Sequence, residues 1–469
     1  MVASAKRTEN DLALLDLTEA SRRVQTKKVS PVELTQACLK RIERLNPELN
    51  AFITVTAESA LQEARRAEGE IQSGAWKGPL HGIPVAVKDL LQTAGVRTTA
   101  ASAVLKTFVP REDAEVVRRL KSAGAVLLGK LNLHEFAYGG SGLVGHFGPA
   151  KNPWNTKHIT GGSSSGSAVA VAAGMCFAAI GTDTAGSIRL PAALCGIVGL
   201  KPTYGLVSTR GVIPLSWSLD HVGPMARTAA DAALMLQTIA SYDAKNIFSR
   251  KFPPVFYPSA MENRPNALRL GVPRDFWQGA DREVKQAVER ALTILSRIAA
   301  SVEEIKLSTA ADFTVVRAEA FAYHQQYLPA KAKKYDAETL RRIQSGAEVS
   351  ATEYIEQRHQ LMWQRREVVD LFEKIDLIVT PSCPNLAPSF AELEKAPKQL
   401  RQKELMMLRN TRPFNMLGLP SISIPCGFSK SGLPVGIQIT GAPNAEGLVL
   451  SLANAFALET DWHTKRPTV

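Results

Sequence analysis

Residues 161–189 read GGSSSGSAVAVAAGMCFAAIGTDTAGSIR, and this stretch carries the strongest structural signals in the chain. A loop of glycine and serine comes first, the helix-forming run 168–173 follows, and an apolar strand at 176–180 leads into a second turn of small residues. The first loop offers hydroxyls and exposed backbone N–H groups at a helix N-terminus, where the helix dipole favours a negatively charged oxygen. A purely structural turn needs only one capping serine. The stretch therefore predicts a strand, a helix and a functional loop together.

The flanking chain alternates apolar strands with helices. Ser30, Pro31 and Glu33 form a strong helix start, with a capping serine, a proline in the first turn and a capping-box glutamate. Strands are expected at 83–88, 125–128, 176–180, 268–272, 377–380, 421–424 and 435–439, and helices at 57–71, 116–123, 228–241, 281–299, 350–374 and 445–458. This order predicts an α/β fold with a large mixed, mostly parallel β-sheet that helices cover on both faces.

The composition excludes several classes of protein. Hydrophobic residues make up 45% of the chain and charged residues 21%, which is typical of globular proteins. The five cysteines include no CxxC pair, so we expect neither disulfides nor a zinc site. The net charge is +12, but the basic residues are mixed with acidic ones along the chain, so nucleic-acid binding is not expected. Residues 1–15 lack the apolar region of a signal peptide and no apolar run could span a bilayer, so a cytoplasmic protein without membrane contact is expected.

Three kinds of chemistry use a loop such as 161–167. A phosphate-binding loop needs a lysine before its last serine or threonine, and Gly166 is followed directly by Ser167. A nucleophile elbow of the GxSxG type needs a strand leading into the turn, and residues 151–158 contain no strand pattern. The third kind joins a serine to a lysine, with a second glycine-flanked serine downstream.

The second turn supplies that serine. Small residues at Thr184, Ala185 and Gly186 allow consecutive N–H groups to face one point, as an oxyanion hole requires, and Ser187 closes the turn. Asp183 and Arg189 flank the turn and are expected to form an ion pair that holds its shape. The same ion pair in an ordinary strand-to-helix turn remains the structural alternative.

Four motifs taken together resemble the amidase signature family. They are GIPVAVKD at 82–89, GGSSSGS at 161–167, GTDTAGSIR at 181–189 and GLKPT at 199–203, and weaker echoes lie at 418–421 and 434–438. The resemblance implies one large amidase domain over residues 1–469. Its signature core lies at 75–240, and a helical, variable region at 243–400 lies over the site. Within that region, residues 381–398 are either a lid or an ordinary long connection.

The resemblance also implies roles for individual residues. Lys88 matches the catalytic lysine, Ser163 the bridging serine that a cis peptide bond precedes, and Ser187 the nucleophile that becomes acylated. The backbone of residues 184–187 matches the oxyanion hole, and Ser164 is assigned to structural support. The family commonly has glycines where this chain has Ser165 and Ala185, so these positions put the loop geometry in question.

Lys88 ends an apolar strand, and burial of an amine lowers its pKa toward the neutral form that can accept a proton. We therefore expect a relay in which Lys88 takes a proton from Ser163 and Ser163 takes one from Ser187, with no metal, cofactor or histidine. The alternative from sequence alone is a buried ion pair of Lys88 with Asp89 or Asp183.

The predicted function is a serine hydrolase that cleaves amides, carbamates or aryl esters. By family match, the substrate pocket includes Tyr138, Gly139, Gly140 and Ser141, although Tyr138 could equally be a core residue. The expected partners are a small amide, carbamate or ester substrate and at most a second copy of the chain, as a monomer or homodimer.

The alternative function is that of an A-type amidotransferase subunit, which acts as a glutaminase and feeds ammonia to a tRNA-linked partner. In that group, the pocket stretch typically reads DEFAMGSS, whereas residues 134–141 here read HEFAYGGS. This departure favours the stand-alone hydrolase.

Overall fold

A computed structural model describes residues 12–261, 265–307 and 312–469. Residues 1–11 lie outside the described residues. They make up most of the segment 1–15, in which no signal peptide is expected. So do residues 262–264 and 308–311 of the expected variable region.

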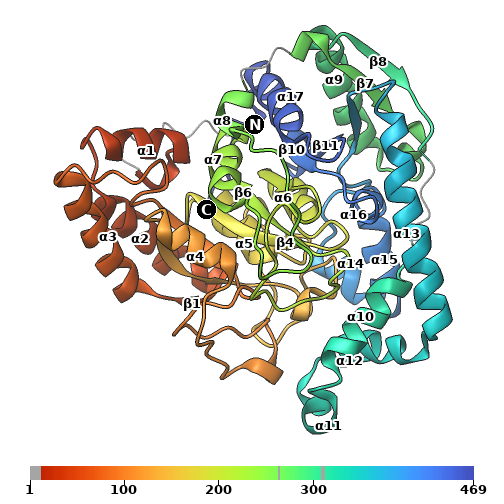
Figure 1. The fold of residues 1–469 in the computed structure, drawn as a ribbon, viewed down its shortest axis with the longest axis horizontal. Coiled ribbons are helices and arrows are strands. Elements are labelled where there is room, and N and C mark those ends of the chain that lie inside the picture. Colours follow the sequence, from red (N-terminus) through yellow and green to blue (C-terminus); the bar gives the residue numbers. More distant parts are fainter. Residues whose placement is uncertain (1–11, 262–264, 308–311) are drawn as a thin grey trace.

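An 11-stranded sheet runs through the molecule (Figure 1) in the order β1-β3-β2-β4-β6-β5-β10-β11-β9-β7-β8. The strands are β1 (Phe52–Val55), β2 (Pro84–Lys88), β3 (Val126–Leu131), β4 (Ala178–Asp183), β5 (Val198–Lys201), β6 (His221–Ala226), β7 (Arg269–Val272), β8 (Ser301–Glu304), β9 (Leu377–Pro381), β10 (Ser421–Phe428) and β11 (Pro434–Gly441). Most are buried along their whole length, which explains their continuous apolar sequences.

Parallel pairing is concentrated in two blocks of this sheet. β2 pairs in parallel with both β3 and β4, and β7 pairs in parallel with β8 and β9. The strands between these blocks pair antiparallel, including the β10–β11 hairpin. The large mixed sheet is therefore confirmed. The expectation that it is mostly parallel is wrong, because six of the ten strand pairs among the described residues are antiparallel, including the edge pair of β1 with β3.

The α-helices include some that pack on both faces of the sheet and some that pack mainly on other helices (Figure 1). They are α1 (Leu17–Gln25), α2 (Pro31–Leu49), α3 (Ala57–Gln72), α4 (Glu115–Ser122), α5 (Ser165–Ala172), α6 (Arg189–Cys195), α7 (Ala229–Ile239), α8 (Tyr257–Ala260), α9 (Arg282–Ile298), α10 (Thr314–His324), α11 (Leu328–Lys331), α12 (Ala337–Gln344), α13 (Ala351–Leu371), α14 (Phe390–Glu394), α15 (Leu400–Met407), α16 (Arg412–Met416) and α17 (Glu446–Leu458). The short helices α5 and α6 contact each other and the central strands, while α7, α9 and α17 form a second group.

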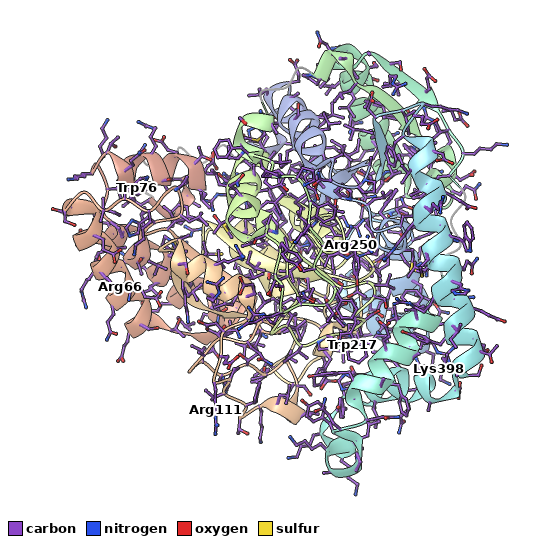
Figure 2. The ribbon with its side chains drawn as sticks, in the orientation of Figure 1. Arg66, Trp76, Arg111, Trp217, Arg250 and Lys398 are labelled. Atoms are coloured by element: carbon purple, nitrogen blue, oxygen red, sulfur yellow. The ribbon has the colours of Figure 1, made fainter. Side chains whose placement is uncertain are left out.

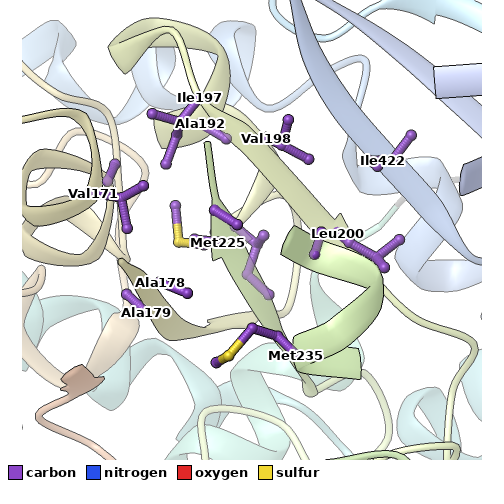
Figure 3. Close-up of a cluster of buried hydrophobic side chains, with 14 of the residues drawn as sticks. Val171, Ala178, Ala179, Ala192, Ile197, Val198, Leu200, Met225, Met235 and Ile422 are labelled. Carbon is purple, nitrogen blue, oxygen red and sulfur yellow. The ribbon is translucent and has the colours of Figure 1, made fainter. Parts of the chain in front are cut away.

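The core between α5, α6 and α7 is built from small and medium apolar side chains. Figure 3 shows Val171 of α5, Ala192 of α6 and Met235 of α7 around Met225 of β6, and all four are fully buried. The predicted capping box is confirmed at the start of α2, where Glu33 N–H donates to the Ser30 hydroxyl and Ser30 N–H donates to the Glu33 carboxylate. α5 packs on β4, α6 packs on β5, β10 and β11, and the two serine-bearing loops directly precede these helices.

Exposed basic residues are dispersed over the molecule. Arg66, Arg111 and Lys398 come from widely separated parts of the fold (Figure 2), and each is exposed. In the part of the chain that the structure describes, no helix combines the length and apolarity that crossing a bilayer requires.

Candidate active site

The central strands bring the two serine-bearing loops to the end of β2. β2 and β4 are parallel neighbours, so Lys88 at the end of β2 and Asp183 at the end of β4 point to the same edge of the sheet. The Ser164 N–H donates to the Ser187 carbonyl at 3.1 Å, which joins the two loops directly. Lys88 and Ser163, which are separated by 75 positions in the sequence, thus meet in one buried place.

Three hydroxyl oxygens surround the fully buried amine of Lys88. Its Nζ lies 2.7 Å from Ser163 Oγ, 3.0 Å from Ser164 Oγ and 2.8 Å from Thr182 Oγ1. Among the described residues no carboxylate lies within ion-pair distance of this amine, because Asp89 faces Lys130 and Asp183 pairs with Arg189. Neither ion pair that the sequence left open is formed.

The hydrogen bonds around Ser164 orient the amine. Ser164 Oγ donates to the Thr182 carbonyl at 3.1 Å, so its single proton is already used and it must accept from Lys88. A neutral amine has two N–H donors and one lone pair. When Thr182 accepts the second N–H, the lone pair is left facing Ser163, which is the direction that proton abstraction from Ser163 requires.

Burial determines the protonation state of Lys88. Removal from water lowers the pKa of Lys88 to about 7, although the carboxylates of Asp183 and Asp220 act in the opposite direction. A substantial fraction of the amine is therefore neutral at neutral pH. A lysine in water, with its pKa near 10.4, is almost entirely charged there.

Ser163 is held by its backbone. The Gly162–Ser163 peptide bond is cis, Gly162 N–H donates to the Gly140 carbonyl at 2.8 Å, and His134 N–H donates to the Ser163 carbonyl at 3.1 Å. Ser187 is nearly buried, with 5% of its surface exposed. Within the described chain, its hydroxyl makes no hydrogen bond to Ser163. The structure therefore contains the contact between Lys88 and Ser163, while the contact between Ser163 and Ser187 is not made.

The second turn is fixed by the Asp183–Arg189 ion pair, in which both side chains are fully buried. Asp183 also accepts the N–H groups of Gly186 at 2.7 Å and Ile188 at 3.1 Å. Burial alone would raise the pKa of Asp183, but the guanidinium of Arg189 holds it well below its usual range. The carboxylate therefore stays charged and ties the turn to the start of α6.

Not every predicted oxyanion donor is available. Because Gly186 N–H is committed to Asp183, the donors left are the N–H groups of Thr184, Ala185 and Ser187, which have no hydrogen-bond acceptor among the described residues. Gly186 itself has φ 137°, and a Cβ built on it would lie 2.1 Å from Thr411 Oγ1, so only glycine fits. Ala185 and Ser165 have no positive φ and stand at positions that tolerate a side chain.

The loop 138–141 is anchored from outside the signature core. Glu404 of α15 accepts both the N–H and the hydroxyl of Ser141, the latter at 2.6 Å, and Arg342 of α12 donates to the Tyr138 carbonyl. The Ser141 hydroxyl therefore donates to Glu404, and among the described residues it makes no hydrogen bond to Ser163 or Ser187. Gly139 packs on the buried ring of His134, since a Cβ there would lie 2.0 Å from that ring.

Sequence reasoning missed three residues of this site. Thr182 lies inside the quoted motif but was not singled out, although it accepts from Lys88. Asp220 accepts from the Thr184 hydroxyl at 2.6 Å, and burial raises its pKa to about 6. Glu404 lies 263 residues from Ser141, and no local pattern indicates such a contact.

Comparisons of the sequence and of the structure with known proteins agree on one family. The Amidase family matches residues 33–450. The chain is 40% identical to the A subunit of glutamyl-tRNA(Gln) amidotransferase from Geotalea daltonii, over 97% of this chain and 99% of that protein. Two solved structures are also similar. The peptide amidase of Stenotrophomonas maltophilia has 32% identity and a TM-score of 0.82 over 97% of this chain and 98% of that one. The corresponding A subunit from Thermotoga maritima has 34% identity and a TM-score of 0.76 over 95% of each chain.

These relatives correct one prediction. A monomer or homodimer that meets only a small-molecule substrate is at odds with relatives that cover almost the whole chain and are named as one subunit of a larger amidotransferase. Their names match the alternative function, the A-type amidotransferase subunit, better than the stand-alone hydrolase.

Proposed function

The chain belongs to the amidase signature family, and from this premise we propose that it is the A-type subunit of an amidotransferase. In this proposal it hydrolyses the side-chain amide of glutamine and supplies ammonia to a partner that acts on aminoacyl-tRNA. The observation that carries the proposal is the 40% identity to the A subunit of a glutamyl-tRNA(Gln) amidotransferase over 97% of this chain and 99% of the relative. The similarity therefore extends over almost the whole of both sequences.

The proposed reaction starts from neutral Lys88. The amine accepts the Ser163 proton, Ser163 accepts the proton of Ser187, and Ser187 Oγ attacks the amide carbon. The developing oxyanion receives hydrogen bonds from the free N–H groups of the second turn. One such donor typically contributes about 3–4 kcal/mol to transition-state stabilisation.

Collapse of the tetrahedral intermediate breaks the C–N bond. The proton that Lys88 accepted returns through Ser163 to the leaving nitrogen, ammonia departs, and an ester on Ser187 remains. Water then adds to this ester while Lys88 again accepts a proton through Ser163, and glutamate is released with Ser187 restored. The contact that Ser163 and Ser187 lack in this structure would have to form when substrate binds, as catalytic hydrogen bonds often tighten only in the complex.

The test is ammonia release from glutamine by the chain alone and together with the partner subunits and charged tRNA. We expect glutaminase activity that rises when partners and aminoacyl-tRNA are present, and no activity in Ser187→Ala. A reaction of Ser187 with a fluorophosphonate shows that the preparation is active. If such a preparation hydrolyses no glutamine under either condition, glutamine is not the substrate.

A second candidate is hydrolysis of a different, larger amide. The similarity to a peptide amidase favours it, whereas Tyr138 of the predicted pocket stretch is only 3% exposed and packs in a buried apolar cluster. The same assay separates the two candidates when peptide amides, aryl amides, carbamates and aryl esters are compared with glutamine. A kcat/KM for a peptide amide that exceeds the value for glutamine, with no response to tRNA, would favour the second candidate.

A further inference from the structure

One loop, residues 215–220, lies between the second turn and the helices α10 and α13. It ends at the buried Asp220, which directly precedes β6. Trp217 of the same loop is 36% exposed (Figure 2), and its ring lies 6.5 Å from that of Tyr323 in α10. The loop therefore runs from the surface of the molecule to the turn that carries the predicted oxyanion donors.

The carboxylate of Asp220 joins this loop to the second turn. Its Oδ1 accepts the Thr184 hydroxyl at 2.6 Å, and its Oδ2 accepts the N–H groups of Leu215 at 2.9 Å and Ser216 at 3.1 Å. Burial raises the pKa of Asp220 to about 6, so the carboxylate is still mostly charged at neutral pH. These three hydrogen bonds therefore compensate a buried negative charge.

The bond to Asp220 fixes the backbone of Thr184. Threonine is β-branched, so its χ1 is stiff and an anchored hydroxyl also restrains the residue's own N–H group. That N–H has no acceptor among the described residues and belongs to the predicted oxyanion hole. Asp183 holds the turn further on, at Gly186. Oxyanion donors are effective only when they are oriented before the reaction, and Asp220 supplies this orientation at Thr184.

A second buried carboxylate holds the same loop from the helical side. Glu319 of α10 accepts the Ser216 hydroxyl at 2.6 Å, the Ser218 N–H at 3.0 Å and the Ser218 hydroxyl. Tyr354 of α13 donates its hydroxyl to the same carboxylate at 2.8 Å. Ser216 thus donates its N–H to Asp220 and its hydroxyl to Glu319. Through this shared residue the two carboxylates connect α10 and α13 with the second turn.

We propose that Asp220 is a positioning residue for the reaction, which orients the oxyanion donors of the second turn through Thr184. Glu319 positions Asp220 in turn, because it fixes the loop that carries this residue. Neither carboxylate touches the substrate. The inference rests on the proposed amide hydrolysis at Ser187 and adds residues outside the two serine-bearing loops.

Thr184→Val tests the link because it removes the hydroxyl and keeps the shape of the side chain. For the amide with the highest kcat/KM, we expect kcat to fall about 10- to 100-fold and KM to stay within about threefold, the effect of losing a hydrogen bond to a charged group. Thr184→Ser keeps the hydroxyl and should restore kcat to within about threefold of the wild type. Thr35→Val is the matched control, since the buried Thr35 hydroxyl donates to the Pro31 carbonyl within α2, and its kcat should equal that of the wild type.

A double-mutant cycle tests whether Asp220 acts through Thr184. Asp220→Asn alone should lower kcat about tenfold, and Glu319→Gln about threefold, both with little change in KM. In the Thr184→Val background, Asp220→Asn should lower kcat by no more than about threefold further, because the link is already broken. Fully additive losses would overturn the inference.

The pH profile separates a positioning role from a general loosening of the site. Lys88 has a pKa of about 7 because it is buried, so water that entered a loosened site would raise this pKa toward its ordinary value. For Thr184→Val we expect the profile of kcat/KM to keep the midpoint of the wild type and to reach a lower plateau. A lower plateau together with a raised midpoint would overturn the inference.

Fluorophosphonate labelling separates this inference from the proposed function, because the reagent reacts whatever amide the enzyme cleaves. Ser187 Oγ forms a bond to phosphorus, fluoride leaves, and negative charge develops on an oxygen in the oxyanion hole. If no amide is cleaved but labelling is about 10- to 100-fold slower in Thr184→Val than in the wild type and Thr35→Val, the positioning role stands and the proposed function fails. Equal labelling rates in all three proteins would overturn the positioning role, whatever the amide assay shows.

Discussion

Two buried lysines on neighbouring strands have different surroundings. Lys88 ends β2 with no exposed surface, and Lys130 lies on the parallel neighbour β3 with 1% exposed. Lys130 lies 3.4 Å from Asp89 and donates to the Leu91 carbonyl and the Thr98 hydroxyl, both at 2.6 Å. Among the described residues, the hydrogen-bond partners of the Lys88 amine are all hydroxyl oxygens.

Burial alone therefore does not make a lysine a base. Burial lowers both pKa values, to about 7 for Lys88 and to about 8 for Lys130, where the Asp89 carboxylate acts in the opposite direction. Lys130 also contacts one hydroxyl, but its other partners are a carbonyl and a carboxylate, which can only accept hydrogen bonds from its amine. Every hydrogen-bond partner of Lys88 among the described residues is a hydroxyl, which can also give up its proton. Lys88 is therefore placed to exchange protons, and Lys130 is placed to hold Asp89.

The largest difference between the two lysines is expected in the rate of catalysis. Lys88→Met should lower kcat for amide hydrolysis by about 10⁴-fold or more, because the relay loses its base. The fold should persist, since no carboxylate loses a partner. Ammonia release and circular dichroism measure both. A kcat of Lys88→Met within about tenfold of the wild-type value would contradict the role of Lys88 as the base.

Stability should show the reverse order. Lys130→Met leaves Asp89 buried without its cation, and removing one partner of a buried pair costs about 3–5 kcal/mol. Urea denaturation should therefore show a much lower free energy of unfolding for Lys130→Met than for Lys88→Met, and Asp89→Asn should restore part of it. Equal losses in the two lysine variants would contradict the assignment.

The pH dependence should report on Lys88. Below its pKa of about 7 the amine is charged and cannot accept a proton, so kcat/KM should fall about tenfold per pH unit below 7 and level off above it. The profile is measured with an amide that does not titrate between about pH 5.5 and 8.5. The same rate at both ends of that range would argue against an amine base.

The smallest effect concerns the orientation of the amine. Thr182→Val removes one acceptor of Lys88 and should lower kcat about tenfold, the size of one lost hydrogen bond. Thr98→Val removes the matching acceptor of Lys130 and is the control. It should reduce stability and leave kcat unchanged. If both valine variants lowered kcat equally, the contrast between the two lysines would be lost.

The sequence predicts local features of this molecule well. The capping box of Ser30 and the apolar strands were visible because each is encoded by adjacent residues. Lys88 and the turn of Ser187 were each expected to follow an apolar strand, but only the family resemblance placed them in one site. The share of antiparallel strands was not predictable from apolar runs, because pairing direction depends on connections that such runs do not encode.

The site was less predictable where contacts cross the chain. Lys88 and Lys130 both end apolar stretches in the sequence, and only their partners distinguish them. Glu404 and Thr411 come from the C-terminal part of the chain and fix loops more than 200 positions away. Asp183 binds the N–H of Gly186, which removes a predicted oxyanion donor, and no spacing rule reveals that bond.

The protonation state of Lys88 can be measured directly by nuclear magnetic resonance. Protein labelled with ¹³C at the lysine Cε position is titrated across the neutral range, and the signal missing from Lys88→Met identifies the residue. We expect a chemical-shift transition for this signal with its midpoint near the pKa of about 7. An ordinary lysine remains charged up to about pH 10. If the Lys88 signal also remained that of a charged amine up to this pH, the assignment of Lys88 as the base would be contradicted.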